Sequence, residues 1–356
     1  MKLSLLVLVG AFSTQFAFAS QNMNPEPWEG FSEPEIMGSG FTHRFNELPL
    51  EGSIDTSTKA WSGDYWASNK GGINYRWNAV KKVGFDYESP TREQALALGQ
   101  DYLAQLSPSE KYDLLIGSYD YPMKKAARAD VSKMASDWAG ICHGWAPASL
   151  HHNEPTPKVL TNPDGVKIPF GSSDIKALLS FYYANFTDKL EYGQAGMRCY
   201  FGRWMGGMRG CDQDLNAGAF HIVLANKIGL QKEGFVVDVD RYRQVWNQPA
   251  IGYKSQVISE EEVGFGAAST AVRVLRVVTQ FTYVDEQDPN SWEPVKGTEN
   301  QKNTTVEYTY LLELDAYDRI VGGKWISAIR PDYIWFKKKE TVFKGILSRL
   351  PELLND

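Results

Sequence analysis

The stretch Asp137-Trp-Ala-Gly-Ile-Cys-His-Gly-Trp-Ala-Pro-Ala-Ser149 places a cysteine between two glycines and continues into residues that suit a helix. This pattern predicts a tight loop that leads into a helix, with Cys142 at the junction and little side-chain bulk around the thiol. The dipole and free N–H groups of a helix amino terminus favour a thiolate and can hold an oxyanion. The stretch therefore suits a thiol nucleophile that attacks carboxamide carbonyls. The alternative is a small buried core residue, which is the usual environment of a free cysteine.

A thiol nucleophile usually needs a histidine as its base, and His221 is the best candidate. It opens the apolar run Phe220-His-Ile-Val-Leu-Ala225, which predicts a half-buried strand after a glycine turn. A satisfied core histidine is the competing interpretation. His143 is the sequence neighbour of Cys142 and points to another side of the helix, so it is a poor base for that thiol. The remaining histidines are His43, His151 and His152.

An acid that orients the histidine is expected on the next strand. The run Gly234-Phe-Val-Val-Asp-Val-Asp240 contains two aspartates on one face of that predicted strand. Asp238 lies deeper in the apolar run, so we expect it to accept the imidazole N–H and fix its orientation. Asp240 and Asn247 are the alternative orienters. Papain-like peptidases and transglutaminases share this arrangement of a thiol on a helix facing a base and an orienter on a hairpin.

Helical patterns precede strand patterns along the chain, which predicts an α+β fold with an antiparallel sheet. In papain/transglutaminase-like form, the thiol helix would pack against the sheet that carries the histidine and the aspartate. The expected helices cover residues 91–106, 107–116, 122–136, 174–186 and 339–350. The expected strands cover residues 220–225, 234–239, 271–283, 305–314 and 325–329.

The amino terminus predicts export. Residues 1–19 carry one positive charge, a short apolar run and a small-residue site ending at Ala19, which is typical of a cleaved secretory signal. A secreted or periplasmic protein follows. Beyond the signal we expect an irregular arm at 20–88, a helical subdomain at 89–136, a catalytic core at 137–338 and a C-terminal helix at 339–356.

Composition excludes several classes of protein. The 356 residues are 43% hydrophobic and 22% charged, with 11 Trp, 18 Tyr and 17 Phe, so wholesale disorder is excluded. A net charge of −6 argues against nucleic acid as the partner, because nucleic acid needs a basic face. No internal stretch approaches the roughly 20 apolar residues of a transmembrane helix.

Three cysteines in an exported chain leave one odd thiol. Cys199 and Cys211 enclose a glycine- and methionine-rich loop, and a disulfide between them would contribute about 3 kcal/mol on the chain-entropy model. Cys142 is then the odd thiol. A zinc site built from Cys199, Cys211 and His221 is a weak alternative, because these residues lack the close paired spacing of zinc knuckles.

A further motif makes the chain recognisable. The segment Val245-Trp-Asn-Gln-Pro-Ala-Ile-Gly-Tyr-Lys254 resembles the surface peptide by which plants detect secreted oomycete cell-wall transglutaminases, the transglutaminase elicitor family, which also has bacterial members. Residues 137–149 resemble the thiol motif of that family and residues 220–226 its histidine segment. Residues 322–325 together with 331–335 resemble a motif near its carboxyl end. The elicitor-like core consists of Trp246, Asn247, Gln248 and Pro249.

The resemblance implies protein-glutamine γ-glutamyltransferase chemistry on protein substrates that bear glutamine and lysine. The Cys142 thiolate would attack a glutamine carboxamide and release ammonia, and a lysine amine would resolve the thioester. His221 would shuttle protons and Asp238 would orient it, while Trp138 would wall the acyl site against water. No cofactor is certain. Calcium is possible, because many transglutaminases require it, and Asp212-Gln-Asp214 could bind it.

Two other functions stay open. A papain-like cysteine peptidase or a deamidase would form the same thioester and differ only in the second substrate. A non-enzymatic extracellular binding protein could keep the fold and present aromatic side chains as a binding face. The tryptophans that suit such a face are Trp28, Trp61, Trp66 and Trp77.

Overall fold

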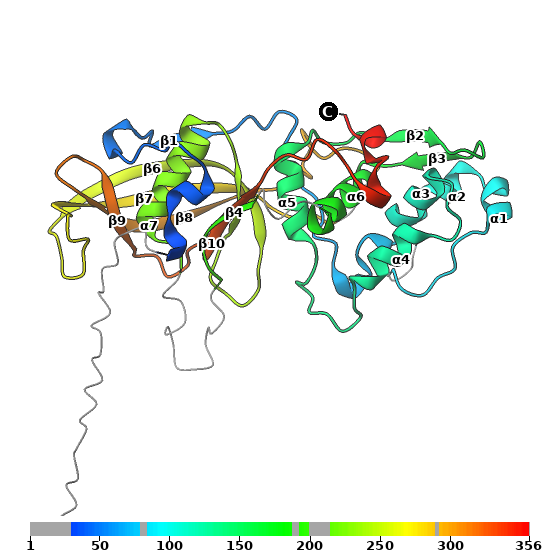
Figure 1. Cartoon of the computed structure of the whole chain (residues 1–356), viewed down its shortest axis with the longest axis horizontal. Helices are drawn as coiled ribbons and strands as arrows, with labels where there is room; N and C mark the ends of the chain where they lie inside the picture. The colour runs from blue at the N-terminus through cyan, green and yellow to red at the C-terminus, as the bar shows by residue number, and fades with distance from the viewer. Residues whose placement is uncertain (1–29, 79–83, 187–191, 199–213, 289–291, 356) are drawn as a thin grey trace, which may run out of the picture.

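The computed structural model describes residues 30–78, 84–186, 192–198, 214–288 and 292–355. The molecule is elongated, with an antiparallel sheet at one end and a helical body at the other (Figure 1). Helix α5 (Cys142–His151) stands between these two parts. The predicted mixture of helices and an antiparallel sheet is therefore confirmed. No helix within the described ranges is long and apolar enough to cross a membrane.

The main sheet has eight strands in the order β4-β10-β5-β6-β7-β8-β9, and β1 pairs with β6 off this path. Every pairing in it is antiparallel. The strands are β1 (Glu51–Ser53), β4 (Tyr192–Gly196), β5 (Phe235–Asp238), β6 (Asn247–Glu261), β7 (Arg273–Val284), β8 (Asn303–Leu314), β9 (Ile320–Trp325) and β10 (Tyr333–Lys337). Strands β5, β7 and β8 match three predicted strands. The strand predicted at 325–329 is wrong, because β9 ends where that segment begins.

The helical body contains α1 (Arg92–Ala97), α2 (Gln100–Ala104), α3 (Pro108–Leu115), α4 (Pro122–Ala129), α6 (Ser172–Asn185) and a hairpin of β2 (Lys158–Thr161) and β3 (Lys167–Phe170). The Ser107 side chain accepts a hydrogen bond from the Glu110 N–H, so the predicted capping box of α3 is confirmed. The single helix predicted at 91–106 breaks in two, because Leu98 is extended and Gly99 disfavours a helix interior.

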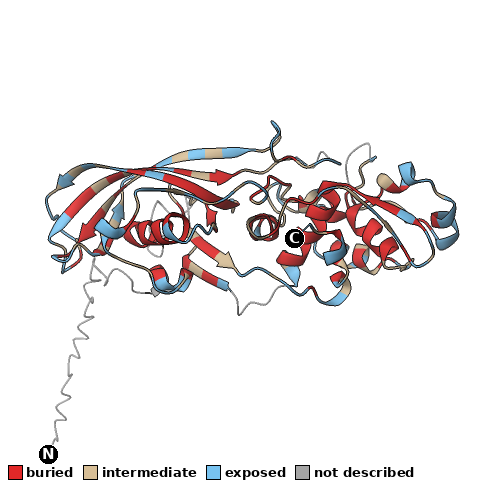
Figure 2. Ribbon diagram, turned by 90° about the horizontal axis from the view of Figure 1, so that it is seen from above, coloured by how far each residue is buried: buried red, intermediate tan, exposed pale blue. Residues whose placement is uncertain are grey.

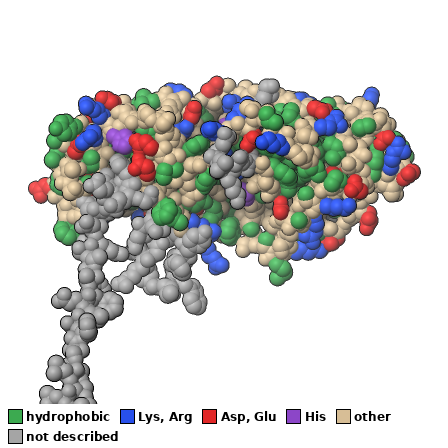
Figure 3. Space-filling model, viewed as in Figure 1, with side chains coloured by type: hydrophobic (Ala, Val, Ile, Leu, Met, Phe, Trp, Pro, Cys, Tyr) green, Lys and Arg blue, Asp and Glu red, His purple; other side chains and the backbone are tan. Residues whose placement is uncertain are grey.

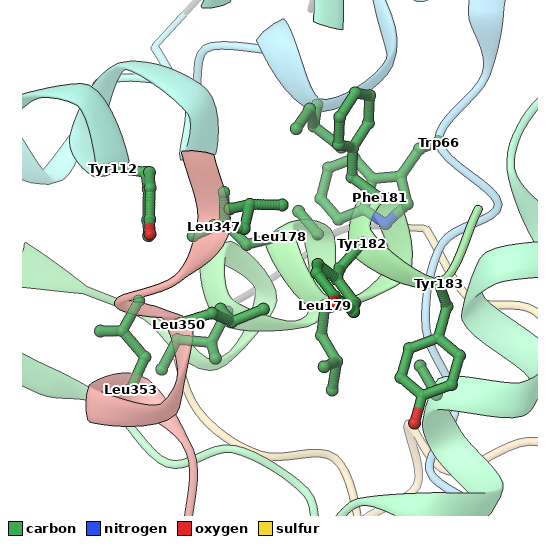
Figure 4. Close-up of a cluster of buried hydrophobic side chains, with 14 of the residues drawn as sticks. Trp66, Tyr112, Leu178, Leu179, Phe181, Tyr182, Tyr183, Leu347, Leu350 and Leu353 are labelled. Carbon is green, nitrogen blue, oxygen red and sulfur yellow. The ribbon is translucent and has the colours of Figure 1, made fainter. Parts of the chain in front are cut away.

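The carboxyl-terminal segment is not the predicted amphipathic helix at 339–350. It forms two short 3-10 turns, Gly345–Leu347 and Leu350–Leu353, and Pro351 at the start of the second turn cannot donate a helical hydrogen bond. The buried side chains of Leu347, Leu350 and Leu353 cover the side of α6 beside Tyr112 (Figure 4). The tail therefore closes the hydrophobic core of the helical body.

The run at 220–225 is a helix, so the predicted strand there is wrong. Helix α7 (Ala217–Leu224) begins after Asn216, whose side chain accepts a hydrogen bond from the Gly218 N–H at 2.8 Å. Every residue of α7 is buried (Figure 2), so its apolar run has no periodicity that separates a helix from a strand. A Cβ on Gly218 would lie 2.4 Å from the Gly322 carbonyl oxygen, which shows how closely α7 approaches β9.

The irregular arm is built into the core. Trp61 is fully buried, and its Nε1 donates a hydrogen bond to the His152 carbonyl oxygen at 3.1 Å. Trp66 is 3% exposed. The expectation that these tryptophans form an external binding face is therefore wrong for both. Trp77 is half-buried and donates to Asp174, while Trp28 lies outside the described residues.

Candidate active site

Cys142 is the first residue of α5, as the sequence predicts. The loop before it is fastened to the arm at three points. The Ile141 N–H donates to the Tyr65 carbonyl oxygen at 2.7 Å, and the Ser68 N–H donates to the Ala139 carbonyl oxygen at 2.7 Å. The Tyr65 hydroxyl donates to the Asp137 carbonyl oxygen at 2.7 Å. These contacts fix the backbone that leads into the thiol.

The two glycines that flank Cys142 serve backbone packing, and the expectation that they clear space around the thiol is wrong. A Cβ on Gly140 would lie 2.2 Å from the Tyr65 carbonyl oxygen. A Cβ on Gly144 would lie 2.0 Å from the Ser180 carbonyl oxygen of α6. Any side chain at either position would separate α5 from its neighbours, so the glycines let α5 settle closely against the arm and α6.

The closest polar partner of the thiol is Asn247, the first residue of β6. Its Nδ2 donates toward the Cys142 sulfur at 3.5 Å, and its Oδ1 accepts a hydrogen bond from Trp335 Nε1 at 2.7 Å. An indole N–H is only a donor, so the Trp335 contact fixes which end of the amide faces the sulfur. The thiol itself donates to the Val245 carbonyl oxygen at 3.8 Å. Cys142, Asn247 and Trp335 are each at most 5% exposed.

Burial dominates the electrostatics of this site. It raises the pKa of the Cys142 thiol to about 11, while the Asn247 amide lowers that pKa and the carboxylates of Glu286 and Asp238 raise it. Burial also raises the pKa of Asp238 to about 8 and that of Glu286 to about 8. The resting site at neutral pH therefore holds a neutral thiol beside carboxyl groups that are largely protonated. Burial shifts the pKa of this thiol upward, which is opposite to the lowering expected from a helix amino terminus.

Asp238 ends β5 and pairs in register with Asn247, which brings it to the thiol end of the site. Its Oδ1 accepts a hydrogen bond from the Trp246 N–H at 3.1 Å, and its Oδ2 is buried without a hydrogen-bond partner among the described residues. Asp240 instead holds the following turn, where its Oδ1 accepts from the Tyr242 N–H at 2.7 Å. Of the three candidate orienters, Asn247 contacts the sulfur.

His221 lies elsewhere. It sits in α7 within a second hydrophobic cluster, and its Nδ1 hydrogen-bonds the Tyr310 hydroxyl of β8 at 2.7 Å. Burial lowers its pKa to about 4. None of the contacts in the described part of the chain joins His221 to Cys142 or to Asp238. The predicted hairpin that would carry both base and orienter is wrong, because α7 directs His221 toward β8.

The elicitor-like segment forms one wall of this site. Trp246 is half-buried, and its ring meets Tyr65 edge-to-face with centroids 5.4 Å apart. Asn247, Gln248 and Pro249 are buried and pair with β5. The segment expected at the surface is therefore mostly interior.

Comparisons with known proteins identify the family and the fold. A family model described as transglutaminase elicitor matches residues 123–348. The chain belongs to the transglutaminase elicitor family. Among solved structures, the GP42 transglutaminase from Phytophthora sojae matches with a TM-score of 0.67 and 22% identity, covering 92% of this chain and 96% of that one. A search of curated proteins gives no match.

Family membership bears out the resemblance read from the four motifs, and the fold matches that of a transglutaminase. The sequence did not single out Glu286, nor Trp335 as a partner of the site. Trp335 ends the recognised motif at 331–335, which is the signal that could have found it. Glu286 follows strand β7 in a segment without a motif, and only the fold brings its carboxyl group near enough to affect the thiol.

The remaining predicted site residues contact arginine side chains or lie outside the described residues. Trp138 is half-buried, and the Arg198 guanidinium lies 5.7 Å from its ring centre. Cys199, Cys211 and Asp212 fall outside the described ranges. Asp214 pairs with Arg330 at 2.7 Å.

Cys142 is a free thiol. Within the described residues no three or more His, Cys, Asp or Glu side chains form a group that could hold a metal ion. Asp212 and Gln213 of the calcium site expected at 212–214 lie outside the described residues.

Proposed function

We propose that this chain is a secreted protein-glutamine γ-glutamyltransferase that forms isopeptide cross-links through a thioester on Cys142. The observation that carries the proposal is the Asn247 amide, which Trp335 holds with its N–H directed at the sulfur. A donor in that position favours the negative charge that develops on sulfur when the thiol is deprotonated. The family and the fold supply the reaction class.

The proposed reaction proceeds in two steps. The Cys142 sulfur forms a bond to the carbonyl carbon of a substrate glutamine, the carbon–nitrogen bond breaks, and ammonia leaves with the proton from the thiol. A lysine amine then attacks the thioester, the carbon–sulfur bond breaks, and the amine proton returns to the sulfur. Backbone N–H groups at the start of α5 are the donors that we assign to stabilise the oxyanion.

Asp238 is the group we assign to carry the thiol proton. Its Oδ2 is buried without a hydrogen-bond partner in the described residues. With a pKa of about 8 the carboxyl group is largely protonated at neutral pH, so the minor ionised form takes up the thiol proton. The role of His221 as proton shuttle stays a prediction. His221→Gln tests it: loss of transfer by folded protein would restore the histidine to the mechanism.

Exclusion of water decides between transfer and hydrolysis of the thioester. The Trp246–Tyr65 pair borders the thiol loop. Trp138 follows Asp137, whose carbonyl oxygen accepts a hydrogen bond from the Tyr65 hydroxyl. We assign these aromatic side chains to the wall of the acyl site. Trp138→Ala is expected to shift product from cross-linked amine toward glutamate.

Incorporation of a tagged primary amine into a glutamine-rich protein tests the proposal. Wild type and Cys142→Ala are compared, each with calcium and with a chelator. Labelling by wild type alone supports acyl transfer from Cys142, and the chelator arm decides whether calcium is needed. Peptide fragments without labelling would support the papain-like peptidase instead. Glutamate formation without labelling would support a deamidase.

A further inference from the structure

A cleft of about 640 Å³ opens at the end of α5 opposite the thiol. The last two residues of α5, the turn before β5, the end of β10 and part of the arm form its walls. Six lysines line it, against two carboxylates from Asp55 and Glu233. The lysines are Lys59, Lys227, Lys232, Lys337, Lys338 and Lys339.

Lys227 is paired with Glu233, and the Lys337 ammonium donates to the Tyr183 carbonyl oxygen at 2.7 Å. The other four lysines outnumber the one remaining carboxylate, Asp55, along this cleft of an acidic chain. The net charge is −6, and acidic and basic side chains are interspersed over the face seen in Figure 3. The carboxyl end of one helix carries only about half a negative charge, so neutralising α5 does not require six lysines. A cleft with low-dielectric walls focuses the field of such charges and attracts anions.

Apolar side chains also line the cleft. Met37, Ile54, Leu150 and Phe336 line it together with the lysines. Lys227 is anchored by Glu233, and its ammonium lies 5.6 Å from the Phe336 ring centre. The cleft therefore offers cationic groups together with apolar side chains, which suits an acidic ligand that also presents apolar side chains.

Lys232 has an unfavourable backbone conformation in the turn that borders the cleft. It adopts a left-handed backbone with φ of 59° in the turn before β5, a conformation that disfavours side chains other than those of Gly, Asn and Asp. This turn presents a lysine to the cleft at a position where glycine would be easier to accommodate.

We propose that this lysine-lined cleft binds an acidic peptide segment that carries apolar residues, as a docking site for protein substrates. The assignment as a substrate site rests on the proposed function. The apolar side chains that line the cleft favour a peptide with apolar residues over a nucleic acid or a polyphosphate.

The distance between the cleft and the thiol sets how many residues must separate the acidic segment of a substrate from its reactive glutamine. Cys142 begins α5 and His151 ends it, so the thiol and the cleft are separated by about 14 Å at 1.5 Å per residue. An extended peptide covers about 3.3–3.6 Å per residue, so at least four residues must separate the acidic segment from the reactive glutamine.

Binding is tested without catalysis. A dye-labelled peptide of glutamates interrupted by two leucines is titrated with full-length Cys142→Ala protein and followed by fluorescence anisotropy. In that background the triple change Lys59→Gln, Lys232→Gln and Lys339→Gln is compared with a matched change of lysines away from the cleft. The control lysines, which are all exposed, are Lys125, Lys133 and Lys254.

We expect the cleft variant to bind about tenfold more weakly, which is about 1.4 kcal/mol, and the control to stay within about twofold of the unchanged lysines. Added salt is expected to weaken binding, since the attraction is ionic. Equal losses in both variants, or no binding of the peptide, would overturn the docking site. Binding of a sulfated polysaccharide but not of the peptide would overturn the assignment to protein.

The role in catalysis is read separately. In proteins with wild-type Cys142, a glutamine substrate with an acidic tail at the required spacing is expected to show a raised KM and an unchanged kcat in the cleft variant. An unchanged KM would refute the docking role. Peptide binding without amine incorporation by any protein would remove the proposed transferase function and leave the peptide site standing.

Discussion

Replacing Asn247 with leucine removes the amide that faces the thiol and keeps a side chain of similar size. A hydrogen bond to a charged group contributes about 1.5–3 kcal/mol, which corresponds to about one to two pKa units. Burial already raises the pKa of Cys142 to about 11, and Asn247 acts in the opposite direction. We therefore expect the pKa of the thiol to rise further in Asn247→Leu.

Alkylation of Cys142 by iodoacetamide measures this change. The rate follows the thiolate fraction, which at pH 8 is about one part in a thousand for a pKa near 11. Asn247→Leu is expected to lower the rate at pH 8 by about 10- to 100-fold. Mass spectrometry of the peptide that contains Cys142 separates its labelling from that of the other two cysteines.

The same change has a structural cost that must be separated from the effect on reactivity. Trp335 Nε1 loses its acceptor, and a buried unsatisfied donor costs about 1–3 kcal/mol of stability. Asn226→Leu is the matched control, because Asn226 is a buried asparagine whose amide bonds Thr42 and Ile222 instead of the thiol. An alkylation rate that stays at the wild-type value in folded Asn247→Leu would refute the assigned role of the amide.

Three further changes test the packing and the buried charges. Gly144→Ala is expected to destabilise the protein by about 1–3 kcal/mol in urea unfolding, because its Cβ would overlap a carbonyl oxygen of α6. Gly99→Ala is the control and should change stability little, because no atom of the described residues lies within contact distance of its Cβ. Lys176→Met leaves the buried Glu154 carboxylate without its cation and should lower the free energy of unfolding by about 3–5 kcal/mol. The double variant that also carries Glu154→Gln should lose less stability than the sum of the two single variants. Burial lowers the pKa of His221 from 6.5 to about 4, so the unfolded chain binds a proton at this residue more readily than the folded protein does. The free energy of unfolding should therefore fall by up to about 3 kcal/mol as the pH falls from 6.5 to 4. In His221→Asn the free energy of unfolding should fall less steeply over this pH range than in the wild type. An unchanged dependence of that free energy on pH would contradict the lowered pKa.

The sequence predicts those parts of the fold that local chemistry determines. The capping box at Ser107 and Glu110 starts α3 as expected, and alternating β-branched residues give β7 and β8. The position of Cys142 follows from the glycines and the helix formers around it. In each case the deciding interaction lies within a few residues along the chain.

Long-range contacts decide the features that the sequence did not predict. The apolar run around His221 suits a buried strand or a buried helix equally, and packing against β8 and β9 selects the helix. The lone local signal was Asn216, which caps it. The partner of the thiol depends on pairing between β5 and β6, so Asn247 was only one of three choices before that register was known.

The arm also sets the order in which the molecule can be completed. Ser62 bonds the backbone of Lys302, 240 residues later, and β1 pairs with β6 about 200 residues ahead of it. Loop closure over about 240 residues costs about 5 kcal/mol of chain entropy before these contacts repay it. Proteins dominated by such distant contacts fold slowly. A chain that must join its beginning to its last third therefore cannot complete the thiol site until nearly all of its length is available to fold.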